Sequence, residues 1–261
     1  APHEYEQERL RILSALQTDP ETLVISATPE AALQITMPQE MLASLTIRIS
    51  PDKPLDTDRL AAALAASGYT RVELVEGAGQ FAVRGGIVDI YPPAAAPYRI
   101  ELFGDEIDRI GTFDVETQRF ADMLDGDILL PPAREVLPSP AAREAILAAV
   151  RRQIKRLAQS GEGTGRASEL LSGELSVLEN GLEPDFADKY LPLIYPAKSC
   201  LLDYFGGLIV VRSSQGCASK AESCATLLAQ SITDMLENGE LSAARSEDGY
   251  MRPWDAVESV G

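Results

Sequence analysis

Short apolar runs alternate with turn-forming residues between positions 80 and 119. Four runs rich in Val, Ile, Tyr and Phe are separated by Gly85-Gly86, by a Pro- and Ala-rich loop over 92–97, and by Gly104-Asp105. Runs of this length divided by such turns are typical of strands that pair with their neighbours in the chain. The pattern therefore predicts an antiparallel meander over residues 80–119.

The third run, residues 98–103, carries the most informative alternation. Successive side chains of a strand point to opposite faces of the sheet. One set comprises Tyr98, Ile100 and Leu102, and the other comprises Arg99, Glu101 and Phe103. The first set predicts a core face, whereas the second places an aromatic ring among charges where solvent is expected. An exposed aromatic residue beside arginine is typical of a binding surface. The alternatives are a ring packed under a helix or a lone exposed ring.

The segments around the meander show helical and strand patterns in turn. Leucines at helical spacing predict a helix over 4–17, and Thr28-Pro29 predicts the start of a short helix over 30–36. The expected strands lie at 22–26, 45–49 and 71–75, and a further helix at 56–67 ends before Gly68. A strand, a helix and antiparallel strands together predict a compact α+β unit that ends near Asp125.

The remainder of the chain is expected to be helical and then α/β. Ser139-Pro140 predicts the start of a helix with an apolar stripe, and a second helix is expected over 168–182, so that the two form an antiparallel pair. The stripe consists of Ile146, Val150, Ile154 and Leu157, and the basic residues beside it are Arg143, Arg151, Arg152, Lys155 and Arg156. Expected strands at 199–205 and 208–211 precede expected helices at 221–236 and 254–260.

Composition and charge narrow the class of function. Of the 261 residues, 45% are hydrophobic and 24% charged, which is typical of a soluble globular protein. No apolar run approaches the length of about 18 residues that a membrane span needs, so we expect a cytoplasmic protein without membrane contact. The net charge of −17 argues against binding to nucleic acid by this chain alone. Its cysteines, Cys200, Cys217 and Cys224, are expected to be buried free thiols rather than metal ligands.

Two stretches of the meander resemble a known family. FAVRGGIVDIYP, residues 81–92, and YRIELFGDEIDRIGTFDVETQR, residues 98–119, are similar to the second domain of the excision-repair protein UvrB. They are more closely similar to the UvrB-homology region near the N-terminus of bacterial transcription-repair coupling factors (Mfd). The resemblance implies that this module docks the excision-repair ATPase UvrA, with the contact on Arg84, Arg99 and Phe103.

The resemblance also implies an architecture and the partners of a longer protein. The fold class is then α/β and α+β, an incomplete and degenerate helicase-like (P-loop-derived) lobe with an inserted α+β domain built on an antiparallel sheet. The implied parts are 1–43 in the lobe, 44–125 as the UvrA-binding module, 126–189 as a helical segment, and 190–261 as the return to the lobe. RNA polymerase, duplex DNA, and ATP with magnesium would be bound elsewhere in the family protein, of which this chain is expected to be a fragment.

The sequence contains only weak candidates for an active site. The glycine-rich stretch 161–166 follows a helix and has Arg166 where a phosphate-binding loop needs lysine. After residues 208–211, where UvrB has a magnesium-binding Asp-Glu pair, the chain has Arg212 and Ser213. His3 has no evident catalytic partner.

We therefore expect no catalysis and no cofactor or metal in this chain. Two alternatives remain open at this point. One is a fragment of UvrB itself, a damage-binding ATP-dependent enzyme. The other is a nucleic-acid binder that uses the basic residues between Arg151 and Arg156.

Overall fold

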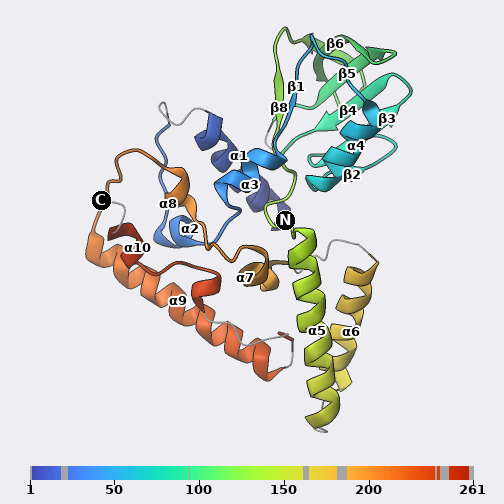
Figure 1. The fold of residues 1–261 in the computed structure, drawn as a ribbon. Coiled ribbons are helices and arrows are strands. Elements are labelled where there is room, and N and C mark those ends of the chain that lie inside the picture. The colour runs from blue at the N-terminus through green and yellow to red at the C-terminus, as the bar shows by residue number, and fades with distance from the viewer. Residues whose placement is uncertain are drawn as a thin grey trace. The chain divides into compact units, whose positions relative to one another are not determined.

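The computed structural model forms two compact units (Figure 1). The structure describes residues 2–18, 23–93, 95–160, 165–180, 187–238, 240–241 and 247–258. One unit contains residues 1–23 and 39–137, and the other contains residues 24–38 and 138–261.

The first unit is an α+β unit with two sheets. Its helices are α1 (Pro2–Thr18), α3 (Gln39–Leu45) and α4 (Thr57–Ala66). Its strands are β1 (Ile47–Ile49), β2 (Thr70–Arg71), β3 (Gln80–Arg84), β4 (Ile87–Tyr91), β5 (Tyr98–Phe103), β6 (Glu106–Phe113), β7 (Phe120–Met123) and β8 (Ile128–Leu130). The strand order of the larger sheet is β2-β3-β4-β5-β6-β7, and β1 pairs with β8 in a separate two-stranded sheet.

The meander expected over 80–119 is confirmed. Strands β3 to β6 pair antiparallel with their neighbours in the chain, and β7 continues the sheet. Gly85 and Gly104 lie in the two tight turns with φ of 60° and 67°, a backbone conformation that glycine adopts without a steric cost. The turn chemistry of the sequence therefore sets the register of the hairpins.

One face of the larger sheet, which we call the core face, carries the main hydrophobic core. Phe81, Val88, Ile90 and Ile100 from the strands pack with Leu64 of α4. Helix α4 begins where the Asp56 carboxylate accepts hydrogen bonds from the backbone N–H groups of residues 58 and 59, which is the usual N-cap. The β1–β8 pair adds to this core, and β8 lies beyond the end expected near Asp125.

The opposite face of the same sheet, which we call the second face, is covered only in part. Val75, Ala82 and Phe113 are buried there in a small separate cluster. Three partly buried residues pack against it: Val72 and Val115, from segments beside strands β2 and β6, and Tyr91 at the end of β4. This face is therefore apolar at one end and open at the other.

In the second unit, helices form all the regular elements that the structure describes. They are α2 (Pro29–Leu33), α5 (Pro140–Ser160), α6 (Gly165–Glu179), α7 (Leu191–Ile194), α8 (Leu201–Tyr204), α9 (Ser214–Glu237) and α10 (Asp255–Glu258), with short 3-10 turns at Ala187–Tyr190 and Glu247–Gly249. The expected pairing of two long helices is confirmed, because α5 and α6 lie side by side in Figure 1 and contact each other.

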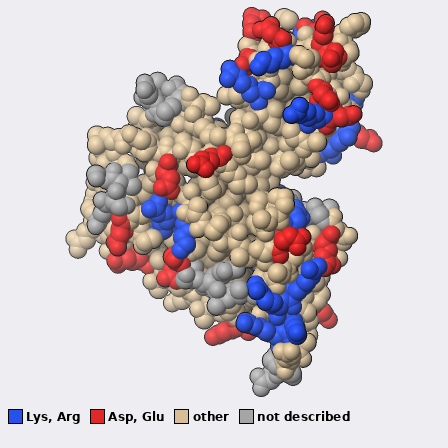
Figure 2. Space-filling view, in the orientation of Figure 1, with Lys and Arg blue, Asp and Glu red and all other residues tan. Residues whose placement is uncertain are grey.

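Helix α5 has the two faces expected from the sequence. Ile146 and Val150 are buried, and Ser139 Oγ accepts a hydrogen bond from the backbone N–H of Ala142 at the first turn. The exposed basic residues of this helix are Arg151, Arg152, Lys155 and Arg156. In Figure 2 a group of Lys and Arg side chains lies over the lower part of this helix.

Four expected strands are wrong, in whole or in large part, where the structure describes them. Of the strand expected over 71–75, only Arg71 lies in a strand, β2. Residues 23–26 and 207–211 belong to no regular element, and most of 199–205 forms α8. Short apolar runs do not distinguish a strand from a helical turn by periodicity. At α8 a local contact decides the outcome, since the Asp203 carboxylate accepts a hydrogen bond from the backbone N–H of Cys200 and caps the helix.

The first and last segments of the chain nevertheless meet within this unit. The backbone N–H of Ile35 donates to the carbonyl of Tyr250, and that of Thr36 to the carbonyl of Ser199, both at 2.8 Å. The backbone N–H of Arg252 donates to the carbonyl of Leu33. Segment 33–36, expected to be helical throughout, thus pairs with residues distant in sequence.

Other expectations include residues that the structure leaves undescribed, among them residues 259 and 260 of the helix expected over 254–260. The glycine-rich stretch 161–164 lies outside the described residues, as do residues 181 and 182 of an expected helix. Among the helices that the structure describes, none has both the length and the apolar character to cross a membrane.

Candidate functional site

The open end of the second face carries Phe103. This residue ends strand β5 just before the Gly104 turn, and it is 84% exposed. The strand presents Tyr98, Ile100 and Leu102 to the core face, so alternation forces Phe103 to the other side. The expectation that Phe103 faces solvent is confirmed.

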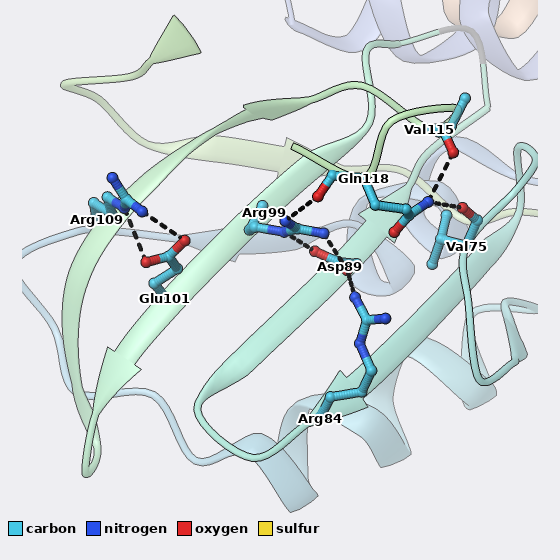
Figure 3. Close-up of polar contacts among 8 residues, drawn as sticks. All are labelled: Val75, Arg84, Asp89, Arg99, Glu101, Arg109, Val115 and Gln118. Carbon is cyan, nitrogen blue, oxygen red and sulfur yellow. Dashed lines mark hydrogen bonds and ion pairs between the residues drawn. The ribbon is translucent and has the colours of Figure 1, made fainter. Parts of the chain in front are cut away.

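Arg99 lies on the same face, but the expectation that it is exposed is wrong. It is only 7% exposed. Its Nε and Nη2 donate to the two carboxylate oxygens of Asp89 at 2.6 and 2.9 Å (Figure 3). The reason is that the small apolar cluster covers this end of the face, and Asp89 stands directly opposite Arg99 on β4. A buried charge is tolerated when it is paired in this way.

Arg84 shares the same carboxylate from the neighbouring strand. It ends β3, its side chain is 40% exposed, and its Nη2 donates to Asp89 Oδ2 at 2.5 Å. Asp89 is opposite Ala82 in the register, so Arg84 reaches it diagonally across the hairpin, a distance that long side chains span. Two arginines therefore converge on one fully buried carboxylate.

Sequence reasoning missed Asp89. The signal was its position as a single charged residue within the apolar strand Ile87–Tyr91, because a charge at the centre of a buried strand needs a partner. The identity of that partner follows only from the strand register, which pairs Asp89 with Arg99.

A turn between β6 and β7 closes over the buried pair. The carbonyl of Gln118 accepts a hydrogen bond from Arg99 Nη1 at 2.7 Å, and the Gln118 side-chain amide donates to the carbonyls of Val75 and Val115 (Figure 3). The guanidinium of Arg99 also lies 4.8 Å from the ring centroid of Phe113, a cation–π contact. Arg99 is thus held by three groups of its own unit, Asp89, the Gln118 carbonyl and the Phe113 ring.

A second ion pair lies nearer the open end. Arg109 donates through Nε and Nη2 to the two oxygens of Glu101 at 2.9 and 2.8 Å, and its guanidinium lies 4.3 Å from the Phe120 ring centroid. The hydrogen bonds that Arg109 donates to the Glu101 carboxylate raise the pKa of Arg109 above its usual value. The positive charge of Arg109 and the negative charge of Glu101 therefore compensate each other within the sheet.

The open end of the second face therefore combines an exposed ring with a half-exposed arginine. In the register, Arg84 lies opposite Ile87, and Ile87 lies opposite Glu101, two residues before Phe103 on β5. From the spacing of strands and residues, the Cα atoms of Arg84 and Phe103 are roughly 12 Å apart. Both fit within one protein-binding footprint of about 800 Å².

Metal binding and nucleophilic catalysis find little support among the described residues. No group of three or more His, Cys, Asp or Glu side chains among them could hold a metal ion. Cys200 is buried, and burial raises the pKa of its thiol, which favours the unreactive protonated form. Cys217 and Cys224 are free but only partly buried, so the expectation that all three thiols are buried holds for Cys200 alone.

Comparisons with known proteins agree with the resemblance found in the sequence. Residues 47–135 match a family model described as the UvrB interaction domain. A transcription-repair-coupling factor of Bacillus subtilis (strain 168) is 30% identical over 252 residues, which cover 92% of this chain and 21% of that protein. Transcription-repair-coupling factors of Mycobacterium bovis and Staphylococcus aureus (strain MRSA252) are 36% and 41% identical over 191 and 120 residues.

These shorter matches cover 71% and 45% of this chain, and 15% and 10% of the respective proteins. At most about a fifth of any of the three relatives is therefore spanned by this chain, as the Bacillus subtilis match covers 21% of that protein. The resemblance to this family is confirmed.

Proposed function

We propose that this chain, a relative of the transcription-repair coupling factors that contains a UvrB interaction domain, is a protein-binding module that docks the excision-repair protein UvrA. The observation that carries the proposal is Phe103, a phenylalanine that is 84% exposed at the end of a sheet strand. Aromatic residues and arginines that are surrounded by smaller contacts supply most of the binding energy of protein interfaces. Phe103 and Arg84 are the anchors, and the buried Arg99 contributes from beneath them.

In the complete protein this module would bring UvrA to an RNA polymerase that has stalled at a lesion. The translocation of duplex DNA, with its ATP and magnesium, would belong to other parts of that protein. The helical second unit would then be the degenerate, helicase-like remnant that carries the module. We propose that it has lost nucleotide hydrolysis, since Arg212 and Ser213 stand where magnesium-binding carboxylates are needed and Ser213 directly precedes helix α9.

The direct test is the substitution Phe103→Ala. Because the ring is exposed, its removal leaves the core intact, and the free energy of unfolding should change by no more than about 0.5 kcal/mol. Truncation of an anchor residue should weaken UvrA binding by about 2 kcal/mol, which is roughly 30-fold in Kd. Isothermal titration calorimetry with purified UvrA measures this value.

Tyr5→Ala is a matched control. Tyr5 is also an aromatic residue of the first unit and is 77% exposed, but it lies on α1 rather than on the sheet. It should leave the affinity unchanged. An equal affinity of the Phe103→Ala variant and the wild type for UvrA would rule out the proposed face.

A further inference from the structure

Asp89 is not one of the proposed contact residues, yet its carboxylate binds the side chains of two of them, Arg84 and Arg99. Its side chain is completely buried, although it lies next to a surface arginine. Resting on the proposed function above, we propose that Asp89 is a positioning residue. It holds the guanidinium of Arg84 in the orientation in which its remaining N–H groups receive an acidic side chain of UvrA.

The hydrogen-bond inventory supports this role. Asp89 Oδ1 accepts from Arg99 Nε, and Oδ2 accepts from both Arg99 Nη2 and Arg84 Nη2. A guanidinium has five N–H donors, and within the described residues the Arg84 side chain uses one of them. The remaining donors lie on the exposed side of a group that is already anchored, which suits a planar carboxylate.

The local charge points to the same partner chemistry. Arg84, Asp89 and Arg99 together carry one negative and two positive charges, and their side chains are 40%, 0% and 9% exposed. The nearby Glu101 is engaged with Arg109 through both of its oxygens. Glu106, which is exposed and opposite Phe103 in the register, adds a negative charge on β6, with two strands between it and the strand of Arg84. The positive charge that remains among Arg84, Asp89 and Arg99 is available to an anion that approaches Arg84, and its attraction is strengthened by the partly desolvated setting.

The buried pair also explains how Arg99 acts without touching the partner. Phe113 and the Gln118 carbonyl fix Arg99, Arg99 fixes Asp89 through two hydrogen bonds, and Asp89 fixes Arg84. A free arginine loses rotamer entropy when it is ordered. Ordering Arg84 before binding removes part of that cost from the interface.

The substitution Asp89→Asn separates orientation from charge. It removes a negative charge from a face that binds an acidic group, so electrostatic attraction alone would make UvrA bind more tightly. The loss of the anchor for Arg84 should instead weaken binding, roughly 3- to 10-fold in Kd, as expected for one side chain that must be ordered during association. A tighter complex would overturn the positioning role.

A double-mutant cycle shows whether Asp89 acts through Arg84. In an Arg84→Ala background the Asp89→Asn substitution should cause no further loss of affinity, because the side chain to be oriented is absent. A purely structural effect of Asp89 would produce the same loss in both backgrounds. That second result would overturn the proposal.

The substitution Arg84→Lys tests the positioning role even if the Asp89→Asn variant folds poorly. The Arg84 side chain is partly exposed, so this change leaves the buried pair in place and keeps the charge. Lysine lacks the planar fork that binds Asp89 and a second carboxylate together. We expect roughly 3- to 10-fold weaker UvrA binding, and an affinity equal to that of the wild type would contradict the positioning role.

The same titrations distinguish this inference from the function on which it rests. If the wild-type chain does not bind UvrA, both fail. If the wild type binds and Phe103→Ala binds roughly 30-fold more weakly, the recruiting function stands. In that case unchanged affinities for Asp89→Asn and Arg84→Lys would remove the positioning role alone.

Discussion

At the scale of single residues, Asp114 stabilises the turn that closes over the buried pair. Its Oδ1 accepts hydrogen bonds from the backbone N–H and the hydroxyl of Thr117 at 2.7 and 2.8 Å. These bonds lower the pKa of the Asp114 carboxyl, and the weaker effect of burial opposes them. A carboxyl whose pKa is lower in the folded state stabilises the fold above its unfolded pKa, and this contribution is lost as the pH falls through the folded pKa.

The substitution Asp114→Asn tests that contribution. At pH 7 the variant should unfold at a lower urea concentration than the wild type, because the ionised acceptor is gone. The difference should shrink as the pH falls below the usual aspartate pKa of about 3.9. Asp52→Asn is the control, since Asp52 is exposed and its variant should follow the wild type. A difference that is constant with pH would contradict the hydrogen-bonded carboxylate.

Alternation along one strand predicted the faces of all six residues from Tyr98 to Phe103, but not their exposure. Phe103 is exposed as expected because it lies at the open end of the sheet. Arg99 is buried because segments distant in sequence cover the other end of the same face. Exposure depends on what packs over a strand, and a local pattern carries no information about that. For the same reason Asp89 was overlooked, since its importance depends on strand register.

At the scale of elements, Gly111 permits the pairing of β6 with β7. A Cβ at this position would lie 2.2 Å from the carbonyl oxygen of Asp122 and 2.3 Å from the ring of Phe120. The Phe120 ring in turn stacks on the guanidinium of Arg109. The absence of a side chain thus allows a strand and an aromatic ring to approach closely.

The substitution Gly111→Ala should displace β7. We expect it to lower the free energy of unfolding by about 1–3 kcal/mol, as overpacking of a close contact does. Urea titration measures this value. Gly77→Ala is the control, because a Cβ there would meet no atom within 4 Å, and its unfolding midpoint should be unchanged. If both variants unfold like the wild type, β7 does not pack as described.

Elements with capping residues or tight turns were predictable from the sequence, whereas isolated apolar runs were not. Helices α2 and α5 begin where Thr28 and Ser139 indicated. The runs at 199–205 and 208–211 have the composition of strands, but the described residues of the second unit form no strand with which they could pair. Without a partner, local hydrogen bonds formed α8, and residues 207–211 stayed irregular.

At the scale of the whole molecule, the net charge argues against the alternative hypothesis that this chain binds nucleic acid through α5. The net charge is −17, but four exposed cations of α5 lie within six residues, and Arg151 pairs with Glu179. We expect the acidic remainder to prevent detectable binding of a short DNA duplex at 150 mM salt, where non-specific complexes have Kd values of about 10⁻⁴–10⁻⁶ M.

Fluorescence anisotropy with a labelled duplex measures this affinity. The variant Arg152→Glu/Lys155→Glu, in which two exposed cations of α5 are reversed, should behave like the wild type in this assay and retain its affinity for UvrA. Salt-dependent binding that the wild type shows and this variant lacks would instead assign DNA contact to α5.

The sequence was least informative about which distant segments meet. Periodicity identified the amphipathic helices of the second unit, but not the contacts of residues 33–36 with Ser199 and Tyr250–Arg252. These contacts are made by backbone groups, which every residue has, so no side-chain pattern marks them. Topology of this kind requires the coordinates.

The irregular segment 207–211 has a practical consequence for any solution experiment. Leu208 and Val210 are 83% and 80% exposed, and within the described part of the chain residues 207–211 make no hydrogen bonds. An uncharged, β-branched stretch with open amides is a template on which a second extended chain can add. Concentrated samples should therefore self-associate and elute early from a sizing column. The stoichiometry of a complex with UvrA is best measured in dilute solution, where self-association of this chain does not add to the apparent size of the complex.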